Sequence, residues 1–260
     1  RADRLADHLP WAALVARGVV LNKDGSFMRV LAFRGPDLES ATEAELVGAC
    51  ARANNALKRF GSGWVLHFEA ERREALGYPA SHFPEAASWL VEEERRAAFE
   101  SAGAHFESCY HLTLSFLPSP DQADMAGRAL VERSDEVKGR DWRQALAAFI
   151  AETDRALDLF SGFMPEVRAL DDAETLTFLH GTISTRRHPV TVPETPMYLD
   201  GVLTDTPLTG GLEPMLGAEH LRTLTILGFP TLSRPGILDA LNHEGFSYRW
   251  VTRFIALDKT

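Results

Sequence analysis

The sequence predicts an α+β fold: a small N-terminal hairpin-and-helix unit, then a mixed sheet with helices on one face, with ferredoxin-like elements. Two observations predict it. An Asp-Gly pair separates two β-branched, apolar runs near the N-terminus, and segments with helical periodicity alternate with short strand-like runs further along. A chain of 260 residues can bury a sizeable core, so we expect it to fold without disulfides.

Residues 1–78 form the first predicted unit, which opens with a β-hairpin. Its strands are the apolar runs 18–22 and 27–33. Asp24 and Gly25 lie between them, and an Asp-Gly pair favours the positive φ values that a tight turn requires.

A helix follows the hairpin. Thr42 and, three residues later, Glu45 predict a capping box at its start, and the helix should run to about Phe60. Its apolar residues recur at helical spacing and predict one core-facing stripe: Leu46, Cys50, Ala53, Leu57 and Phe60. The segment 64–70 is then predicted to be a strand beside the hairpin.

Residues 79–260 form the second predicted unit, an acidic α+β domain reached through the proline-containing segment 76–86. The predicted helices cover residues 87–103, 141–160, 172–184 and 234–245. The predicted strands cover residues 108–118, 165–170, 220–230 and 246–257, and residues 197–211 are expected to be loop and edge strand.

Charge is unevenly distributed along the chain. The net charge is −10, yet residues 1–80 hold 11 bases and 10 acids, whereas residues 81–260 hold 16 bases and 27 acids. Nucleic-acid binding depends on neutralising phosphates, so nucleic acid is an unfavoured partner for the second part. The nearly neutral first part is free to face a membrane surface or another protein.

The cysteines and the chain ends indicate the compartment. Cys50 and Cys109 are too few for a disulfide framework, and we expect both to be small buried hydrophobic side chains. No apolar run approaches the roughly 18 residues of a membrane-spanning helix, and the charged start does not resemble a secretory signal. The sequence therefore predicts a soluble, cytoplasmic chain. Its start at Arg1 and its end after a strand-like run suggest a piece of a longer protein.

Motifs for catalysis and metal binding are missing from the sequence. A phosphate-binding loop requires Gly-Lys-Ser/Thr, and none of the four lysines follows a glycine. Neither Gly-x-Ser-x-Gly nor His-Glu-x-x-His occurs. Cys109 and His111 are expected to pack as a pair on a strand, and His180, His188 and His220 show no ligand spacing. We predict no catalytic, cofactor-binding or metal-ligating residue in this chain.

Five residues are the candidates for contact with a partner: Trp11, Arg29, Arg34, Arg186 and Arg187. Trp11 could lean into a membrane interface or pack under the hairpin, and packing is favoured because few bases surround it. Arg186 and Arg187 form the one basic cluster of the acidic part and could contact an acidic partner.

Two alternative functions remain open at this point. Arg29 and Arg34, together with Arg52, Arg59 and Trp64, could contact single-stranded DNA, since such sites combine basic side chains with aromatic stacking. A free-standing enzyme with a ferredoxin-like cleft is the other alternative. It would need titratable groups that converge, and the sequence offers only scattered histidines.

Several segments in order resemble one known family. They are "LADHLPWAALV", the hairpin with the "GPDLES" that follows it, "YHLTLSFLP", "HGTIS", "LTILGFP" and "YRWVTRFIALD". Together they resemble the CagE/TrbE/VirB family, the large ATPases of type IV secretion and conjugative transfer, and above all its conjugal-transfer members. The resemblance covers nearly the whole chain.

The resemblance implies a function for a chain that lacks the phosphate-binding loop. It implies the non-catalytic N-terminal portion of a secretion ATPase, whose RecA-like domain follows C-terminally and binds ATP and magnesium. It also implies attachment to inner-membrane subunits of the secretion machine, peripheral association with the bacterial inner membrane, and packing of subunits in a hexamer. No ATP-binding residue of the family can be placed on this sequence, because no position matches.

Overall fold

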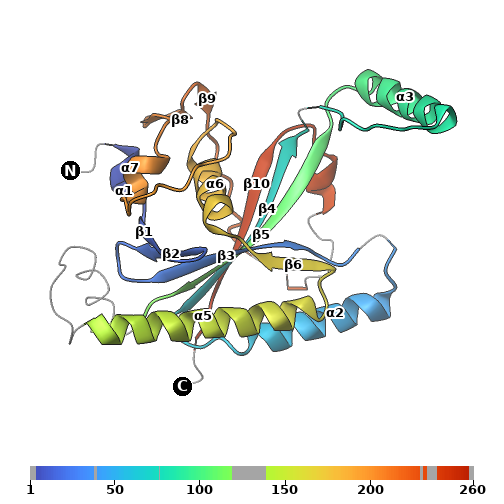
Figure 1. The fold of residues 1–260 in the computed structure, drawn as a ribbon. Coiled ribbons are helices and arrows are strands. Elements are labelled where there is room, and N and C mark those ends of the chain that lie inside the picture. The colour runs from blue at the N-terminus through green and yellow to red at the C-terminus, as the bar shows by residue number, and fades with distance from the viewer. Residues whose placement is uncertain are drawn as a thin grey trace.

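The computed structural model describes residues 4–37, 40–75, 77–118, 139–228, 231–232 and 239–257. Within them, helices pack against a seven-stranded sheet, and a separate three-stranded sheet lies beside it (Figure 1). The predicted α+β class is confirmed.

The main sheet runs in the order β1-β2-β3-β5-β4-β10. Its strands are β1 (Trp11–Ala16), β2 (Val19–Asn22), β3 (Phe27–Arg34), β4 (Trp64–Glu74), β5 (Phe106–Phe116), β6 (Glu166–Ala169) and β10 (Tyr248–Ile255). The first half of β3 pairs with β2 and its second half pairs with β6, on the same edge. Each pairing within the described residues is antiparallel, so these strands form no mixed sheet.

The predicted hairpin is confirmed as β2 and β3. Gly25 has φ +84°, and its amide donates to the Asn22 carbonyl at 3.0 Å. The Asp24 carboxylate accepts a hydrogen bond from the Ser26 amide at 2.9 Å, so the Asp24 side chain also stabilises the turn. The Asp-Gly pair therefore has a structural role in the turn.

The predicted position of the segment 64–70, directly beside the hairpin, is wrong. The segment 64–70 does form a strand, within β4, but β5 lies between β4 and β3. Leu112 and Leu114 of β5 are 0% exposed, and the central position gives them a neighbouring strand on each side. Strands from the predicted units 1–78 and 79–260 thus share one sheet, and their division into separate units stays a prediction.

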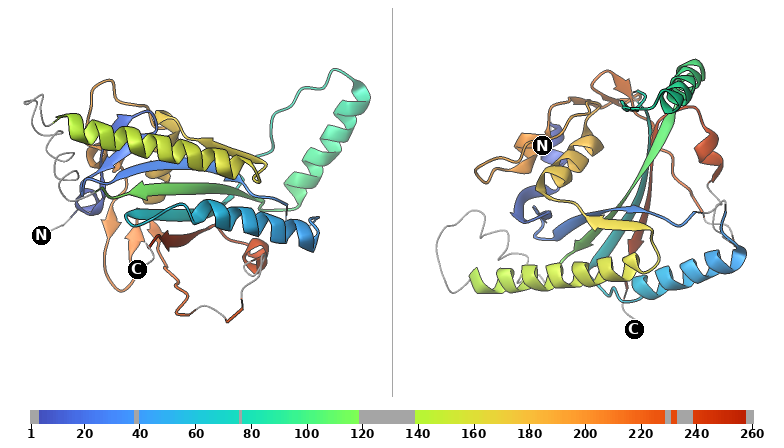
Figure 2. Two further views of the ribbon diagram at one scale, coloured as in Figure 1. Left: turned by 90° about the horizontal axis from the view of Figure 1, so that it is seen from below. Right: turned by 45° about the vertical axis from the view of Figure 1, so that its right-hand side comes forward.

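Helices cover both faces of the sheet, whereas the sequence predicted one face. The described helices are α1 (Leu5–His8), α2 (Glu43–Leu57), α3 (Ala86–Ser101), α5 (Gly139–Ser161), α6 (Asp172–Ile183) and α7 (Leu199–Leu203). Figure 1 shows α2 and α5 on one face and α6 and α7 on the other. In both views of Figure 2, α3 projects away from the sheet.

Two apolar cores explain the two helical faces. The first joins α2 and α5 to the sheet, and in it Trp64 stacks on Phe149 with ring centroids 5.6 Å apart. The second joins α6 and α7 to the other face through Trp11, Leu176 and Leu203. Alternate residues of a strand face opposite sides, so β1 to β3 contribute to both cores.

The start of α2 confirms the capping box. Glu45 donates its amide to Thr42 Oγ1 at 3.3 Å, and the Thr42 amide donates to Glu45 Oε2 at 2.7 Å. The expected burial of Cys50 is wrong, because this side chain is exposed while Ala56 and Phe60 are buried. The stripe that faces the core is therefore rotated from the predicted one. Cys109 is half-buried.

The region after α7 departs most from the sequence prediction. Residues 220–230 were expected to form a strand, yet residues 221–228 are exposed and irregular, with Leu224 90% exposed. No described strand pairs with them, and β propensity without a partner does not make a sheet. Residues 229 and 230 of the predicted strand lie outside the described residues. The small sheet instead consists of β7 (Leu208–Thr209), β8 (Met215–Leu216) and β9 (Glu219–His220).

The predicted helix 234–245 is described only in part. Its residues 239–243 form a 3₁₀ turn, η1 (Asp239–His243), and residues 234–238 lie outside the described residues. None of the described helices combines the length and apolar content that crossing a membrane requires.

Candidate functional site

A charged cavity opens between the second half of β3, β5, β6 and α6, with a volume of about 820 Å³. We name it the arginine cavity. Its charged lining residues are Arg34, Arg73, Arg168, Arg186, Arg187, Glu71, Glu166 and Glu174. Five arginines against three glutamates give a local excess of positive charge on a chain whose net charge is −10.

Three of the five predicted partner residues line this cavity. Arg34 is 64% exposed and pairs with Glu166 at 2.8 Å. Arg186 is 69% exposed, and its nearest carboxylate, on Asp205, is 3.9 Å away. Arg187 pairs with Glu71, which also lines the cavity. The tertiary structure therefore joins residues that lie far apart in the sequence.

Arg29 and Trp11 lie elsewhere. Arg29 is 13% exposed and donates to Thr153 Oγ1 at 2.9 Å and Asp154 Oδ1 at 2.6 Å, both on α5. Trp11 is 7% exposed and packs in the core under α6 and α7. Trp64 is 8% exposed and stacked on Phe149, so the aromatic platform proposed for single-stranded DNA is internal.

A buried ionic network extends from the cavity through Glu71, one of its lining residues. Glu71 of β4 pairs with Arg249 of β10 at 3.1 Å, and Arg249 also lies 3.4 Å from Glu69. Burial alone would raise the pKa of Glu71, but the Arg249 and Arg187 guanidiniums outweigh it and lower this pKa. Burial raises the pKa of Glu69 in spite of Arg249.

Comparison with known proteins identifies the family. The family model for "Type IV secretion system ATPase VirB4/TrbE, N-terminal domain" matches residues 18–124. Conjugal transfer protein TrbE of Rhizobium radiobacter is 34% identical over 270 residues, which is 97% of this chain and 33% of that protein. The first of two partial proteins of Sinorhizobium fredii, each described as a probable conjugal transfer protein TrbE, is 43% identical over 117 residues. That match covers 44% of this chain and 78% of the Sinorhizobium protein.

The chain belongs to the VirB4/TrbE family. The predicted resemblance is thereby confirmed. The chain spans about a third of the length of the Rhizobium radiobacter relative. Residues 18–124, which match the N-terminal domain of the family, hold the hairpin and the central strands β4 and β5. The arginine cavity of this VirB4/TrbE domain also uses β6 and α6, beyond that match.

Cys109 and His111 of β5 face the cavity of this VirB4/TrbE chain. Burial raises the pKa of the Cys109 thiol, which keeps the sulfur protonated and a poor nucleophile. Burial also lowers the pKa of His111 to about 4, and its ring packs on Phe178 with centroids 4.5 Å apart. The packing of these two side chains as a core pair stays a prediction.

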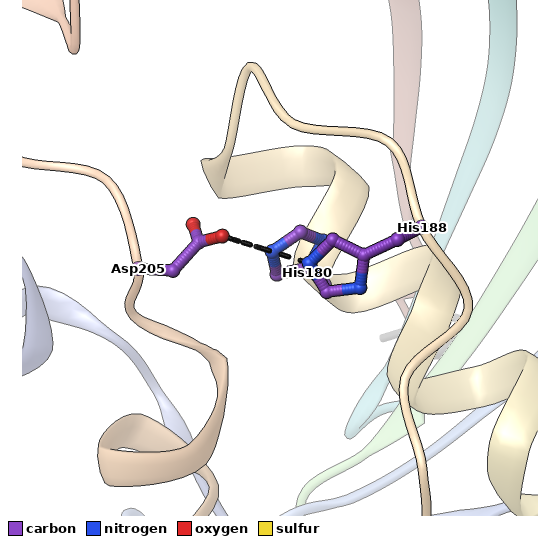
Figure 3. A group of neighbouring side chains, drawn as sticks. All are labelled: His180, His188 and Asp205. Carbon is purple, nitrogen blue, oxygen red and sulfur yellow. Dashed lines mark ion pairs between the residues drawn. The ribbon is translucent and has the colours of Figure 1, made fainter.

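Sequence reasoning missed a cluster that includes two of the cavity's histidines. His180 in the last turn of α6, His188 in the following connection and Asp205 after α7 converge in space (Figure 3). The sequence alone does not connect the two histidines, because no metal-ligand spacing motif joins a residue at the end of a helix to one in the following loop. Their convergence depends on α7 packing against α6, which local sequence does not reveal.

Proposed function

We propose that this chain is the non-catalytic docking and assembly portion of a conjugal-transfer type IV secretion ATPase. It links an ATP-hydrolysing C-terminal domain to the inner-membrane secretion complex. Membership of the VirB4/TrbE family supports this function. The observation that carries it is the arginine cavity, where exposed arginines gather on an otherwise acidic chain.

The chemistry of the cavity favours an acidic protein segment as partner. Side chains of Arg34, Arg168 and Arg186 are 60–69% exposed at its rim, where a guanidinium can bind a carboxylate with two parallel hydrogen bonds. Charge complementarity of this kind steers association and selects partners. The partner in this proposal is an acidic segment of an inner-membrane subunit.

The proposal places the chemistry of the full-length protein outside this chain. ATP and magnesium bind the C-terminal domain, since the sequence here holds no Gly-Lys-Ser/Thr loop. Self-association as a hexamer, and a cytoplasmic position peripheral to the inner membrane, belong to the same proposal.

A charge-reversal experiment tests the docking function in the full-length protein. Arg34→Glu combined with Arg186→Glu should abolish co-purification with the inner-membrane complex and leave ATP hydrolysis at the wild-type rate. Both side chains are exposed, so the fold should tolerate the change. Arg59→Glu is the matched control, because Arg59 is exposed and follows α2 on the other face of the sheet.

Two results would contradict the proposal. One is wild-type association by the double variant. The other is ATP turnover by the isolated 260-residue chain that a substitution within this chain removes.

A further inference from the structure

We propose that His180, His188 and Asp205 form a binding site for a divalent transition-metal ion, with Zn²⁺ as the best-matched ion. His180 Nε2 lies 3.1 Å and His188 Nε2 lies 3.7 Å from Asp205 Oδ2 (Figure 3). One donor atom from each residue lies within 4.8 Å of the other two. Tetrahedral ligands about 2.0–2.1 Å from zinc are roughly 3.3 Å from one another, so the cluster is close to ligand spacing.

His180 supplies an independent indication of a missing ligand. Its side chain is only 3% exposed, and its Nε2 atom is buried without a hydrogen-bond partner. Asp205 Oδ2 is near, but it lies off the direction in which this nitrogen would donate a hydrogen bond. Buried polar atoms are rarely left unsatisfied, and a cation between the two groups would satisfy both.

Hydrogen bonds on the side away from the metal site orient the other two ligands, His188 and Asp205. His188 Nδ1 lies 3.1 Å from the Pro189 carbonyl, which can only accept, so Nδ1 carries the proton and Nε2 keeps its lone pair. Asp205 Oδ1 accepts hydrogen bonds from Ser184 Oγ at 2.7 Å and from Thr206 Oγ1 at 2.8 Å. Oδ2 therefore remains for the metal, and such second contacts are typical of metal ligands.

Electrostatics around Asp205 suit a cation. Burial alone would raise the pKa of Asp205, but the hydrogen bonds from Ser184 and Thr206, with the nearby His180 ring, outweigh it and hold this pKa well below its ordinary value. The carboxylate is thus charged at neutral pH. Arg186 competes for it at 3.9 Å, but this side chain is 69% exposed and can turn into solvent when a metal binds.

The donor set selects the kind of ion. Two imidazoles and one carboxylate favour zinc or another first-row transition metal over magnesium or calcium, which prefer oxygen ligands. His188 is 53% exposed, which gives the ion a path from solvent and a position for a water ligand. A bound ion would join the end of α6, the following connection and the segment after α7.

Metal titration of the 260-residue chain tests this site. After treatment with a chelator, Zn²⁺ should bind one ion per chain in calorimetry, and Co²⁺ should give the visible absorption of a low-symmetry site with nitrogen ligands. His188→Ala should weaken zinc binding by more than about tenfold, since even loss of an outer contact costs 10- to 100-fold. Asp205→Asn should weaken it similarly.

His220→Ala is the matched control for these variants. His220 is also an exposed histidine beside a carboxylate, 63% exposed and 3.9 Å from Glu213, but lies outside the cluster. It should bind zinc as the wild type does. Zinc should also raise the thermal unfolding midpoint of the wild type and of His220→Ala, but not of His188→Ala. No zinc binding by the wild type, or wild-type affinity in His188→Ala, would overturn the proposal.

Discussion

Arg249 of β10 lies directly opposite Glu71 of β4 in the sheet, and its Nη2 atom is 3.1 Å from Glu71 Oε1. Arg187 binds the same carboxylate from the connection after α6. Both guanidiniums also donate to the Gly181 carbonyl in the last turn of α6. The pair therefore joins the edge strand β10 both to β4 and to the helix above it.

Removing Arg249 should destabilise the chain strongly. Arg249→Met leaves the Glu71 carboxylate, 8% exposed, without its cross-strand partner. Breaking a buried pair costs about 3–5 kcal/mol when the remaining charge has no other partner. Arg187 still pairs with Glu71 in this variant, so we expect a loss at the lower end of this range, about 3 kcal/mol, in the free energy of unfolding from urea denaturation. Arg34→Met is the control, since the exposed Arg34–Glu166 pair should contribute about 1 kcal/mol or less. Equal losses in the two variants would contradict the network.

Acid should destabilise the chain through His111. Burial lowers the pKa of His111 from 6.5 to about 4, so between these values the unfolded chain binds a proton that the folded chain does not. The contribution of His111 to the free energy of unfolding is complete above the higher value and falls by at most about 3 kcal/mol as pH drops to the lower one.

Urea denaturation between about pH 7 and pH 4 measures this effect. His111→Leu should flatten the slope of stability against pH, because it removes the titrating group and keeps an apolar side chain. The raised pKa of Glu69 acts in the opposite direction and is common to both proteins, so the difference between the two slopes isolates His111. Identical slopes would show that His111 titrates normally.

Trp64 should be a principal support of the core between the sheet and α5. Its ring lies 5.0 Å from Phe60, 4.9 Å from Phe116 and 5.6 Å from Phe149, centroid to centroid. Trp64→Ala should lower the free energy of unfolding by about 3–5 kcal/mol, measured by urea denaturation. Trp89→Ala on α3 is the control, because this ring is 53% exposed and its loss should change stability by about 0.5 kcal/mol or less. A small effect at Trp64 would contradict the described packing.

The capping box of α2 should make a smaller contribution. Thr42→Ala removes the side chain that accepts the Glu45 amide, and the loss of an N-cap costs about 1 kcal/mol. Thermal unfolding followed by circular dichroism would register it as a lowered midpoint. Thr195→Ala is the control, because Thr195 is exposed and lies outside the helices and strands, so the midpoint should stay nearly unchanged. A loss at Thr195 equal to that at Thr42 would argue against the cap.

Features that depend on near neighbours were determined by the sequence alone. Asp24 and Gly25 indicated the hairpin and Thr42 with Glu45 indicated the helix start, because turns and caps are formed by residues within about four positions. Helical periodicity likewise identified the helix of residues 141–160, which lies within α5. The ordered segments also identified the family.

Features that depend on distant neighbours were decided by the tertiary structure. The run 221–228 has strand propensity but pairs with no described strand, whereas β5 pairs with a strand on each side and is central in the sheet. Arg34 and Arg186 were candidate residues individually, but only the packing of α6 over β3 and β6 places them in one cavity. His180, His188 and Asp205 carried no joint signal at all. The physical reason is the same in each case. Side chains far apart in sequence come into contact only when helices and strands pack their apolar faces together, and that packing depends on the whole chain.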